Sequence, residues 1–292
     1  YEAYPEAQEV FDEATEALGY DMAKLCFEGP EEALRITENT QPTILTTSVA
    51  ALRALVSHGI QPDIVAGLSL GEYSALVAAS AIQFKDAVKL VRTRGKLMQE
   101  EVPDGVGGMA AILGLGDSDV ELACERAEAF GVVQAANYNC PNQLVIAGEL
   151  QAVTKAVEEA KALGAKKAVM LPVSAPFHTS LLRGAGEKLK SHLVEVEASP
   201  LLVSVIANVN ALPYESESVI TERLVAQVSN PVLWSKSVER MVEEGVDLFI
   251  EVGPGNALSK FIKKIAKEVT ILSVEDVESL EATVAYIKER QA

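Results

Sequence analysis

Residues 62–79 have the sequence Pro-Asp-Ile-Val-Ala-Gly-Leu-Ser-Leu-Gly-Glu-Tyr-Ser-Ala-Leu-Val-Ala-Ala, from which the fold class is easiest to infer. The run 62–66 is short and rich in β-branched residues, which predicts a strand, and the run 72–79 predicts a helix. Between them, Gly67-Leu68-Ser69-Leu70-Gly71 matches G-x-S-x-G in the strand-to-helix context where this pattern forms a nucleophile elbow. The stretch therefore predicts one βα unit of an α/β protein, in which the serine side chain projects from the turn and is accessible.

The glycines two positions either side of Ser69 are expected to relieve crowding in this sharp turn. Backbone segments pass so close there that a side chain at Gly67 or Gly71 would clash. The backbone N–H of Leu70, at the helix N-terminus, is then expected to point to where an oxyanion would form, so Leu70 is the predicted oxyanion-hole donor. The alternative is a plain glycine-flanked turn with a capping serine.

Composition and element order also favour an α/β protein. Apolar residues make up 49% of the 292 residues and aromatic residues only 5%, which is more typical of α/β proteins than of β-sandwiches. Strands and helices that alternate along the chain imply a mostly parallel sheet covered on both faces. The sequence opens within a predicted helix, so we expect the native N-terminus, with a first strand, to be missing.

A small domain is predicted to be inserted into a larger one. The helix predicted over 84–101 ends at Pro103-Asp104-Gly105, where proline and glycine break the pattern. From 109 to 173 the predicted order is β-α-β-β-α-β, which is the ferredoxin-like pattern. We therefore predict a large α/β catalytic domain formed by residues 1–102 and 174–292, and a ferredoxin-like small domain at 103–173.

A serine nucleophile needs a base at neutral pH, and the histidines of the chain are His58, His178 and His192. His58 precedes a glycine at a predicted helix C-terminus, and His192 lies inside an amphipathic helix, so both are expected to be structural. His178 lies in a proline-bounded loop where the small domain returns to the large one. Elimination makes His178 the candidate base, although a lone loop histidine is more often incidental.

Arg94 lies on the apolar face of the helix predicted over 84–101, whereas the lysines of this helix lie on the opposite face. A guanidinium directed toward a core cannot deprotonate, so it needs an anion or carbonyl oxygens to satisfy its five donors. The residues alone leave its partner open between an internal carboxylate and a substrate carboxylate.

Charge and cysteine usage exclude several classes of function. The 25 Lys and Arg against 42 Asp and Glu give a net charge of −17, which argues against a general attraction to nucleic acid or anionic membranes. The chain has three cysteines without metal-ligand spacing, and it has no signal peptide and no apolar run long enough to span a membrane. These features favour a reducing cytoplasm.

Residues 251–256 follow a strand and precede a helix but lack the spacing of a phosphate loop, so we expect a tight turn there.

Several of these motifs together resemble the malonyl-CoA:acyl carrier protein transacylase family. The resemblance covers essentially the whole chain and implies a hydrolase-like, mostly parallel large domain with a ferredoxin-like insertion and an active site in the cleft between them. The matching segments, in family order and at compatible spacing, are Gly67 to Ala75, Arg94 to Gln99, Asn137 to Asn139, Pro176 to His178, Asn230 to Trp234 and Glu251 to Gly255.

The resemblance also implies a reaction. Malonyl would pass from malonyl-CoA to the phosphopantetheine thiol of acyl carrier protein, in fatty acid biosynthesis, through an ester on Ser69 and without a metal or bound cofactor. His178 would act as general base and acid, and Arg94 would bind the malonyl carboxylate. The other implied roles are an oxyanion donor at Leu70, a backbone carbonyl that orients the histidine at Gln227, and a ring that disfavours methylmalonyl at Phe177.

Two features depart from the family pattern. Leu68 stands where many members have histidine, although that side chain need not take part in proton transfer. The family's N-terminal Gly-Gln-Gly-Ser-Gln segment, whose glutamine supplies a second oxyanion N–H, is absent, so we expect poor activity without it. The alternatives are an α/β-hydrolase-type thioesterase, which needs an acid to orient its histidine, and a catalytically inactive carrier-binding module.

Carrier docking is predicted to use local lysines, because carrier proteins of this pathway are acidic and the net charge of −17 would repel them. Residues 260–267 are the densest basic segment. The alternative is that these lysines form only the solvated face of an amphipathic helix.

Overall fold

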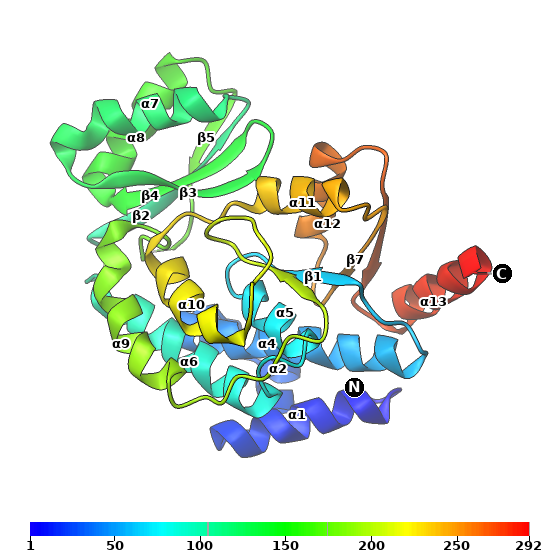
Figure 1. Ribbon diagram of the computed structural model, residues 1–292. Helices are drawn as coiled ribbons and strands as arrows, with labels where there is room; N and C mark the ends of the chain where they lie inside the picture. The colour runs from blue at the N-terminus through cyan, green and yellow to red at the C-terminus, as the bar shows by residue number, and fades with distance from the viewer. Residues whose placement is uncertain (104, 174, 292) are drawn as a thin grey trace.

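The computed structural model describes residues 1–103, 105–173 and 175–291. Figure 1 shows two groups of elements, a larger group that contains both ends of the chain and a smaller group inserted within it. Asp104 and Ser174, at the predicted borders of the small domain, and Ala292, at the predicted end of the large one, lie outside the described residues.

The larger group surrounds two short parallel sheets with helices (Figure 1). β1 (Ile64–Ala66) pairs with β6 (Ser204–Ile206), and β7 (Leu248–Val252) pairs with β8 (Thr270–Val274). The helical segments of this group are α1 (Pro5–Leu18), α2 (Met22–Glu28), α3 (Glu31–Arg35), α4 (Thr37–Ser57), α5 (Gly71–Ala78), α6 (Phe84–Glu101), η2 (Ser180–Leu182), α9 (Arg183–Leu193), η3 (Glu217–Val219), α10 (Ile220–Ser229), α11 (Trp234–Glu243), α12 (Ala257–Ile265) and α13 (Val277–Gln291).

The sheets of the larger group differ from the predicted single, mostly parallel sheet. Their pairings are parallel, but in the described part of the chain β1–β6 and β7–β8 form separate two-stranded sheets. The composition of a run identifies a strand locally, whereas its neighbours depend on packing against remote segments. The predicted α/β class agrees with these elements, and the predicted continuity of the sheet was wrong.

The smaller group is a four-stranded antiparallel sheet with two helices packed on it (Figure 1). The strand order is β3-β4-β2-β5, and each pairing is antiparallel. A separate apolar cluster fills the space between the helices and the sheet. In chain order the elements are β2 (Gly107–Leu113), α7 (Asp117–Ala127), η1 (Glu128–Phe130), β3 (Val133–Cys140), β4 (Gln143–Glu149), α8 (Leu150–Ala162) and β5 (Lys167–Met170).

β3 is longer than the strand predicted over 132–137 and also joins the two groups. Its ladder continues through two register shifts past the buried polar residues Asn137 and Asn139, which a hydrophobic pattern does not identify. Tyr138 N–H donates to Val232 O and Val232 N–H donates to Ala136 O, both at 2.9 Å. The segment after α10 is therefore bonded directly to the small sheet.

α6 begins and ends at its predicted residues and crosses the largest core cluster. Its buried face includes Ala87, Val91, Arg94 and Met98 at helical spacing. Gly95 is packed so tightly against the start of α4 that a Cβ there would lie 2.6 Å from Thr37 O. The absence of a side chain at Gly95 thus lets α6 approach α4 closely beside Arg94.

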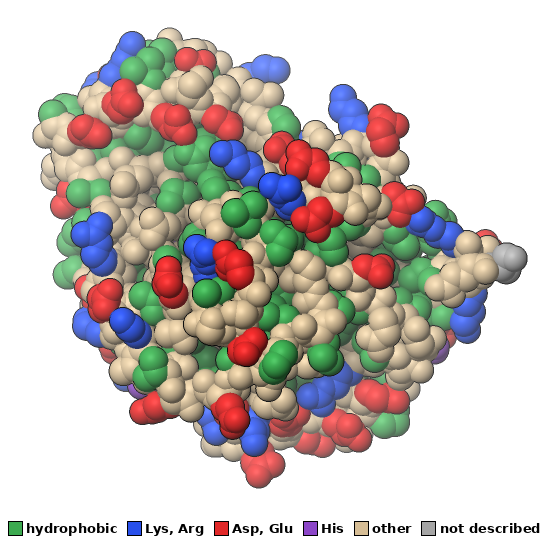
Figure 2. Space-filling view, viewed as in Figure 1, with side chains coloured by type: hydrophobic (Ala, Val, Ile, Leu, Met, Phe, Trp, Pro, Cys, Tyr) green, Lys and Arg blue, Asp and Glu red, His purple; other side chains and the backbone are tan. Residues whose placement is uncertain are grey.

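Acidic and basic side chains are interspersed over the face seen in Figure 2. Within the described residues, no helix combines the length and apolar character needed to cross a membrane. Cys26, Cys124 and Cys140 are free thiols. Burial raises the pKa of Cys26 to about 11 and that of Cys124 to about 12, so both are protonated and poorly nucleophilic.

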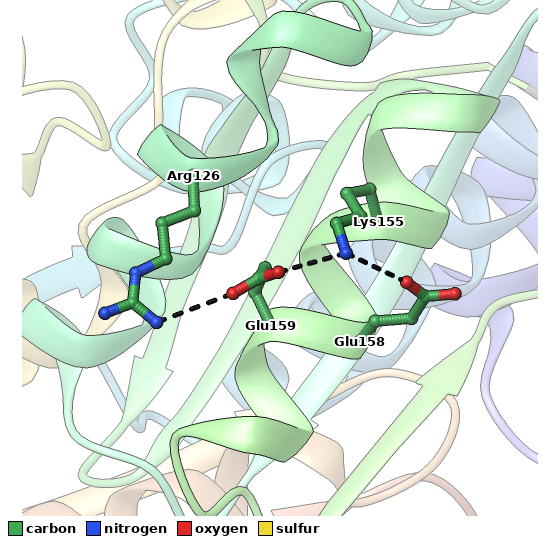
Figure 3. A network of polar contacts seen from close by, with 4 residues as sticks. All are labelled: Arg126, Lys155, Glu158 and Glu159. Carbon is green, nitrogen blue, oxygen red and sulfur yellow. Dashed lines mark hydrogen bonds and ion pairs between the residues drawn. The ribbon is translucent and has the colours of Figure 1, made fainter.

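A small ion-pair network connects α7 with α8 on the surface of the smaller group (Figure 3). Arg126 Nη1 lies 3.5 Å from Glu159 Oε2, and Lys155 Nζ lies 3.0 Å from Glu159 Oε1 and 3.2 Å from Glu158 Oε2. Solvated pairs of this kind contribute little to stability, so the packing of these helices depends mainly on the apolar cluster beneath them.

Candidate active site

Ser69 lies at the turn between β1 and α5 with a φ of 54°, a conformation that non-glycine residues rarely adopt. Gly67 is required there, because a Cβ on it would lie 2.1 Å from the carbonyl carbon and oxygen of Gly71. The prediction that Gly71 is also crowded was wrong, since a Cβ on Gly71 would meet no atom within 4 Å. The close approach is one-sided: the Gly67 Cα faces the Gly71 backbone, while the Cβ direction of Gly71 is open.

Leu70 follows the serine with helical dihedrals and directly precedes α5. The next two N–H groups are used, because Gly71 N–H donates to Leu68 O and Glu72 N–H donates to Ser69 O. Leu70 N–H donates to no acceptor in the described part of the chain. An unused N–H at a helix N-terminus beside a nucleophile can stabilise a developing negative charge.

His178 is buried beside Ser69, with 3% of its surface exposed. Its Nε2 lies 2.7 Å from Ser69 Oγ, and its Nδ1 lies 2.8 Å from the backbone oxygen of Gln227. Because a carbonyl oxygen only accepts, Nδ1 carries the proton and Nε2 is left to accept one from the serine. His58 and His192 are exposed, and neither contacts this site.

The charge state of His178 suits a base. Burial and, to a smaller extent, the Arg94 guanidinium together lower its pKa to about 4, against the opposing effect of the backbone bonds with Gln227 and Asn230. The imidazole is therefore neutral at neutral pH and free to accept a proton.

Arg94 is buried, with 2% of its surface exposed, and it directs its guanidinium at Ser69. Nη2 donates to Ser69 Oγ at 3.0 Å and to Gln227 Oε1 at 2.9 Å, while Nη1 donates to Gln41 Oε1 at 2.6 Å. Nε has no hydrogen-bond partner among the described residues. The guanidinium also lies over the ring of Tyr73, 5.6 Å from its centroid.

The partners of Arg94 bear on the choice that the sequence left open, because they include no internal carboxylate. In the described part of the chain no ion pair joins Arg94 to a carboxylate. Neutral amide and hydroxyl oxygens hold the guanidinium, so its charge is not neutralised by a direct contact. Burial lowers the pKa of Arg94, but a guanidinium stays protonated in proteins. The site can therefore accept an anion.

Four residues of the site were missed by the sequence analysis: Gln41, Glu72, Asn208 and Tyr214. Asn208 stabilises the turn between β1 and α5. Its Oδ1 accepts from Ser69 N–H at 2.6 Å, and its Nδ2 donates to Gly67 O at 2.7 Å. An acid in the first turn of a helix, as at Glu72, suits the helix dipole and gives no sign that it is buried. Gln41 beside a proline inside a helix was the only local irregularity that could have drawn notice.

The remaining predicted positions have distinct surroundings. Gln227 lies in α10, fully buried, and contributes both its backbone oxygen and its amide to the site. Phe177 is half-buried and packs against the main core and against the cluster beneath β2 and β4, so it lies where the two groups of elements meet.

The turn after β7 forms no phosphate loop. The Glu251 carboxylate accepts from Leu258 N–H at 3.0 Å and from Ser259 N–H at 2.7 Å, so the first donors of α12 are occupied by an internal anion.

Known proteins are similar to this chain over nearly its whole length. The family described as "Acyl transferase domain" matches residues 2–292. A malonyl CoA-acyl carrier protein transacylase from Bacillus subtilis (strain 168) is 45% identical over 290 residues, covering 99% of this chain and 92% of the relative.

Solved structures superpose closely. The malonyl CoA-acyl carrier protein transacylase from Clostridium perfringens ATCC 13124 gives a TM-score of 0.96 at 49% identity, covering 99% of this chain and 92% of the other. A malonyl-transacylase solved in complex with its type II PKS acyl-carrier protein gives 0.95 at 42% identity, covering 97% and 92%. A half-buried serine within hydrogen-bond distance of a buried histidine and a buried arginine, on a chain this similar throughout its length, makes the protein a member of the malonyl CoA-acyl carrier protein transacylase family.

Proposed function

We propose that the protein transfers malonyl from malonyl-CoA to the phosphopantetheine thiol of acyl carrier protein, in fatty acid biosynthesis, and that Ser69 carries the malonyl group between them. The observation that carries this proposal is that Ser69 Oγ lies within hydrogen-bond distance of both a neutral histidine and a buried guanidinium. The histidine activates the hydroxyl, and the guanidinium selects an acyl group that ends in a carboxylate.

The reaction has two half-reactions at one serine. In the first, Ser69 Oγ attacks the thioester carbonyl carbon as its proton passes to His178 Nε2, and Leu70 N–H donates to the oxyanion. The carbon–sulfur bond then breaks, and the imidazolium returns its proton to the departing CoA thiolate. In the second, the carrier thiol gives its proton to His178 and attacks the ester, and Ser69 Oγ leaves and takes that proton back.

Two residues would shape acyl selection. Arg94 Nη2 reaches the serine oxygen directly, so an acyl group attached there brings its terminal carboxylate next to the same guanidinium. Phe177 is half-buried and directly precedes His178 in the chain, and a bulky ring at this position would disfavour the α-methyl branch of methylmalonyl.

The backbone carbonyl of Gln227 would orient His178, a role that thioesterases of the α/β-hydrolase type give to a carboxylate. We also propose the finer architecture: a hydrolase-like domain from 1–102 and 174–292, and a ferredoxin-like domain at 103–173. The β-α-β-β-α-β element order and the antiparallel pairing of the small sheet support the second assignment. A cytoplasmic location stays a prediction from cysteine usage.

Intact-mass measurement after mixing with malonyl-CoA tests the reaction. We expect the protein to gain one malonyl group, peptide mapping to place it on Ser69, and the group to move to added holo carrier protein. Release of free malonate at the same rate with and without carrier would indicate a thioesterase instead. An unchanged mass would indicate a binding module without catalytic activity.

A further inference from the structure

We propose that Glu72 is a positioning residue for malonyl selection: its carboxylate fixes which end of the Gln227 amide faces Arg94. This inference rests on the proposed function, because it concerns how the arginine is held ready for the substrate carboxylate. Glu72 does not contact the nucleophile's hydroxyl, and it acts through Gln227.

Glu72 is fully buried, and each of its bonded neighbours donates to it. Its Oε1 accepts from Tyr214 OH at 2.6 Å and from Asn208 N–H at 3.3 Å, and its Oε2 accepts from Gln227 Nε2 at 2.8 Å. An ionised carboxylate accepts at both oxygens and cannot donate, so this environment matches the ionised form. Burial raises the pKa of Glu72 to about 7, while the three donors and the Arg94 charge oppose that shift.

The amide of Gln227 lies between groups that only accept and a group that only donates. Its Nε2 donates to Glu72 Oε2 and to the backbone oxygen of Ser69, both at 2.8 Å, which uses both of its hydrogens. Its Oε1 accepts from Arg94 Nη2 at 2.9 Å. Turning the amide over would face Nε2 with the guanidinium and Oε1 with a carboxylate and a carbonyl, so every one of these contacts would be lost or repulsive.

Arg94 depends on this orientation because its partners are neutral. Gln227 Oε1 holds Nη2 and Gln41 Oε1 holds Nη1, which sets the plane of the guanidinium without cancelling its charge. A direct Glu72–Arg94 pair would neutralise the guanidinium and compete with the substrate. Because the Gln227 amide lies between them, Glu72 does not contact Arg94 directly, yet it still sets the orientation of the guanidinium through that amide.

Glu72→Gln tests the inference, because the new side chain has nearly the same shape but offers one amide donor where Glu72 accepts. With its oxygen kept toward Tyr214 and Asn208, its nitrogen faces Gln227 Nε2, and relief requires the Gln227 amide to turn its own nitrogen toward Arg94. We expect the malonyl-to-acetyl ratio of kcat/KM to fall about tenfold to a hundredfold, the effect of losing one buried hydrogen bond to a charged group. The loss should appear mainly in the KM for malonyl-CoA, with kcat for acetyl-CoA nearly unchanged.

Two other variants separate positioning from a structural role. Tyr214→Phe removes a donor that stabilises the ionised Glu72 but keeps the side chain that fixes Gln227, so its ratio should fall less than that of Glu72→Gln even where its Tm falls as far. Glu222→Gln makes the same charge change at an exposed position of α10 and should alter neither property. A fall in Tm shared by Glu72→Gln and Tyr214→Phe, with both ratios unchanged, would overturn the inference.

The outcomes also separate this inference from the proposed function. If the wild type forms no malonyl ester on Ser69, the proposed function fails before any variant is considered. If the wild type loads malonyl and Glu72→Gln keeps the wild-type ratio, the positioning role alone fails. Should Glu72→Gln not fold, Gln227→Met removes the same oriented amide, and retention of the wild-type ratio by that variant would overturn the role.

Discussion

Replacing Arg94 with alanine should separate malonyl binding from general acyl transfer. Its Nη groups donate to neutral oxygens at 2.6–3.0 Å, and no carboxylate of the described residues forms an ion pair with them, so the charge of the guanidinium is available to a substrate carboxylate. Each hydrogen bond to a charged group contributes about 1.5–3 kcal/mol, so a lost bidentate contact should cost about 3–6 kcal/mol. At about 1.4 kcal/mol per decade, kcat/KM for malonyl-CoA should fall by about two to four orders of magnitude.

The stability of Arg94→Ala is expected to change much less than its selectivity. The substitution opens a cavity and leaves the Gln41 and Gln227 amide oxygens without their donor, which destabilises the fold. It also removes a buried charge that has no direct carboxylate partner in the described part of the chain, which stabilises it. Because these effects oppose one another, we expect only a small shift in Tm.

The assay compares kcat/KM for malonyl-CoA and acetyl-CoA, with Tm measured on the same variants. Acetyl-CoA has no free carboxylate, so its value should fall little or rise, and the preference should flatten or reverse. Arg94→Lys should restore only part of the preference, because a point charge does not reproduce the planar fork. Arg92→Ala is the matched control, since Arg92 lies on the same helix but stacks 5.1 Å from the ring centroid of Tyr20. An unchanged ratio with a large loss of Tm would refute the substrate-binding role.

Ser69→Ala is expected to abolish covalent loading by malonyl-CoA in an intact-mass measurement, and a malonylated variant would contradict its role as nucleophile. His178→Ala should lower the acylation rate by about two to four decades, the usual contribution of a positioned base, and a larger loss at either exposed histidine would contradict that assignment. Lowering the pH from about 8 to about 6 should protonate Glu72, whose pKa is raised to about 7, while His178, with a pKa lowered to about 4, stays neutral and Arg94 stays charged. The malonyl-to-acetyl ratio should therefore fall across this range at nearly constant acetyl transfer, and a flat ratio would count against the role of Glu72. Charge reversal of the exposed lysines in 260–267 should slow transfer to an acidic carrier at low salt and leave loading from malonyl-CoA unchanged, and unaltered transfer would remove this segment as a docking site.

Local patterns predicted much of the fold. The helix over 84–101 was predicted at its observed bounds, because an apolar residue every three or four positions is a property of the helix itself. The G-x-S-x-G turn was placed correctly between β1 and α5, because the steric need for glycine at Gly67 arises within five residues of chain. The strand that was underestimated, β3, continues through polar residues whose burial comes from packing against another segment.

The sequence by itself determined many of the elements after residue 62, the position of the strand-to-helix turn that carries Ser69 and the presence of an arginine on an apolar helix face, since each follows from residues close together in the chain. Only the tertiary structure decided what surrounds that arginine. The amide of Gln227 comes from 133 residues away and that of Gln41 from 53. Glu72 is 155 residues from Gln227, yet the two meet at 2.8 Å. The sequence around a polar side chain does not indicate which donor or acceptor it will bond to, because that pairing forms only after distant helices have packed together.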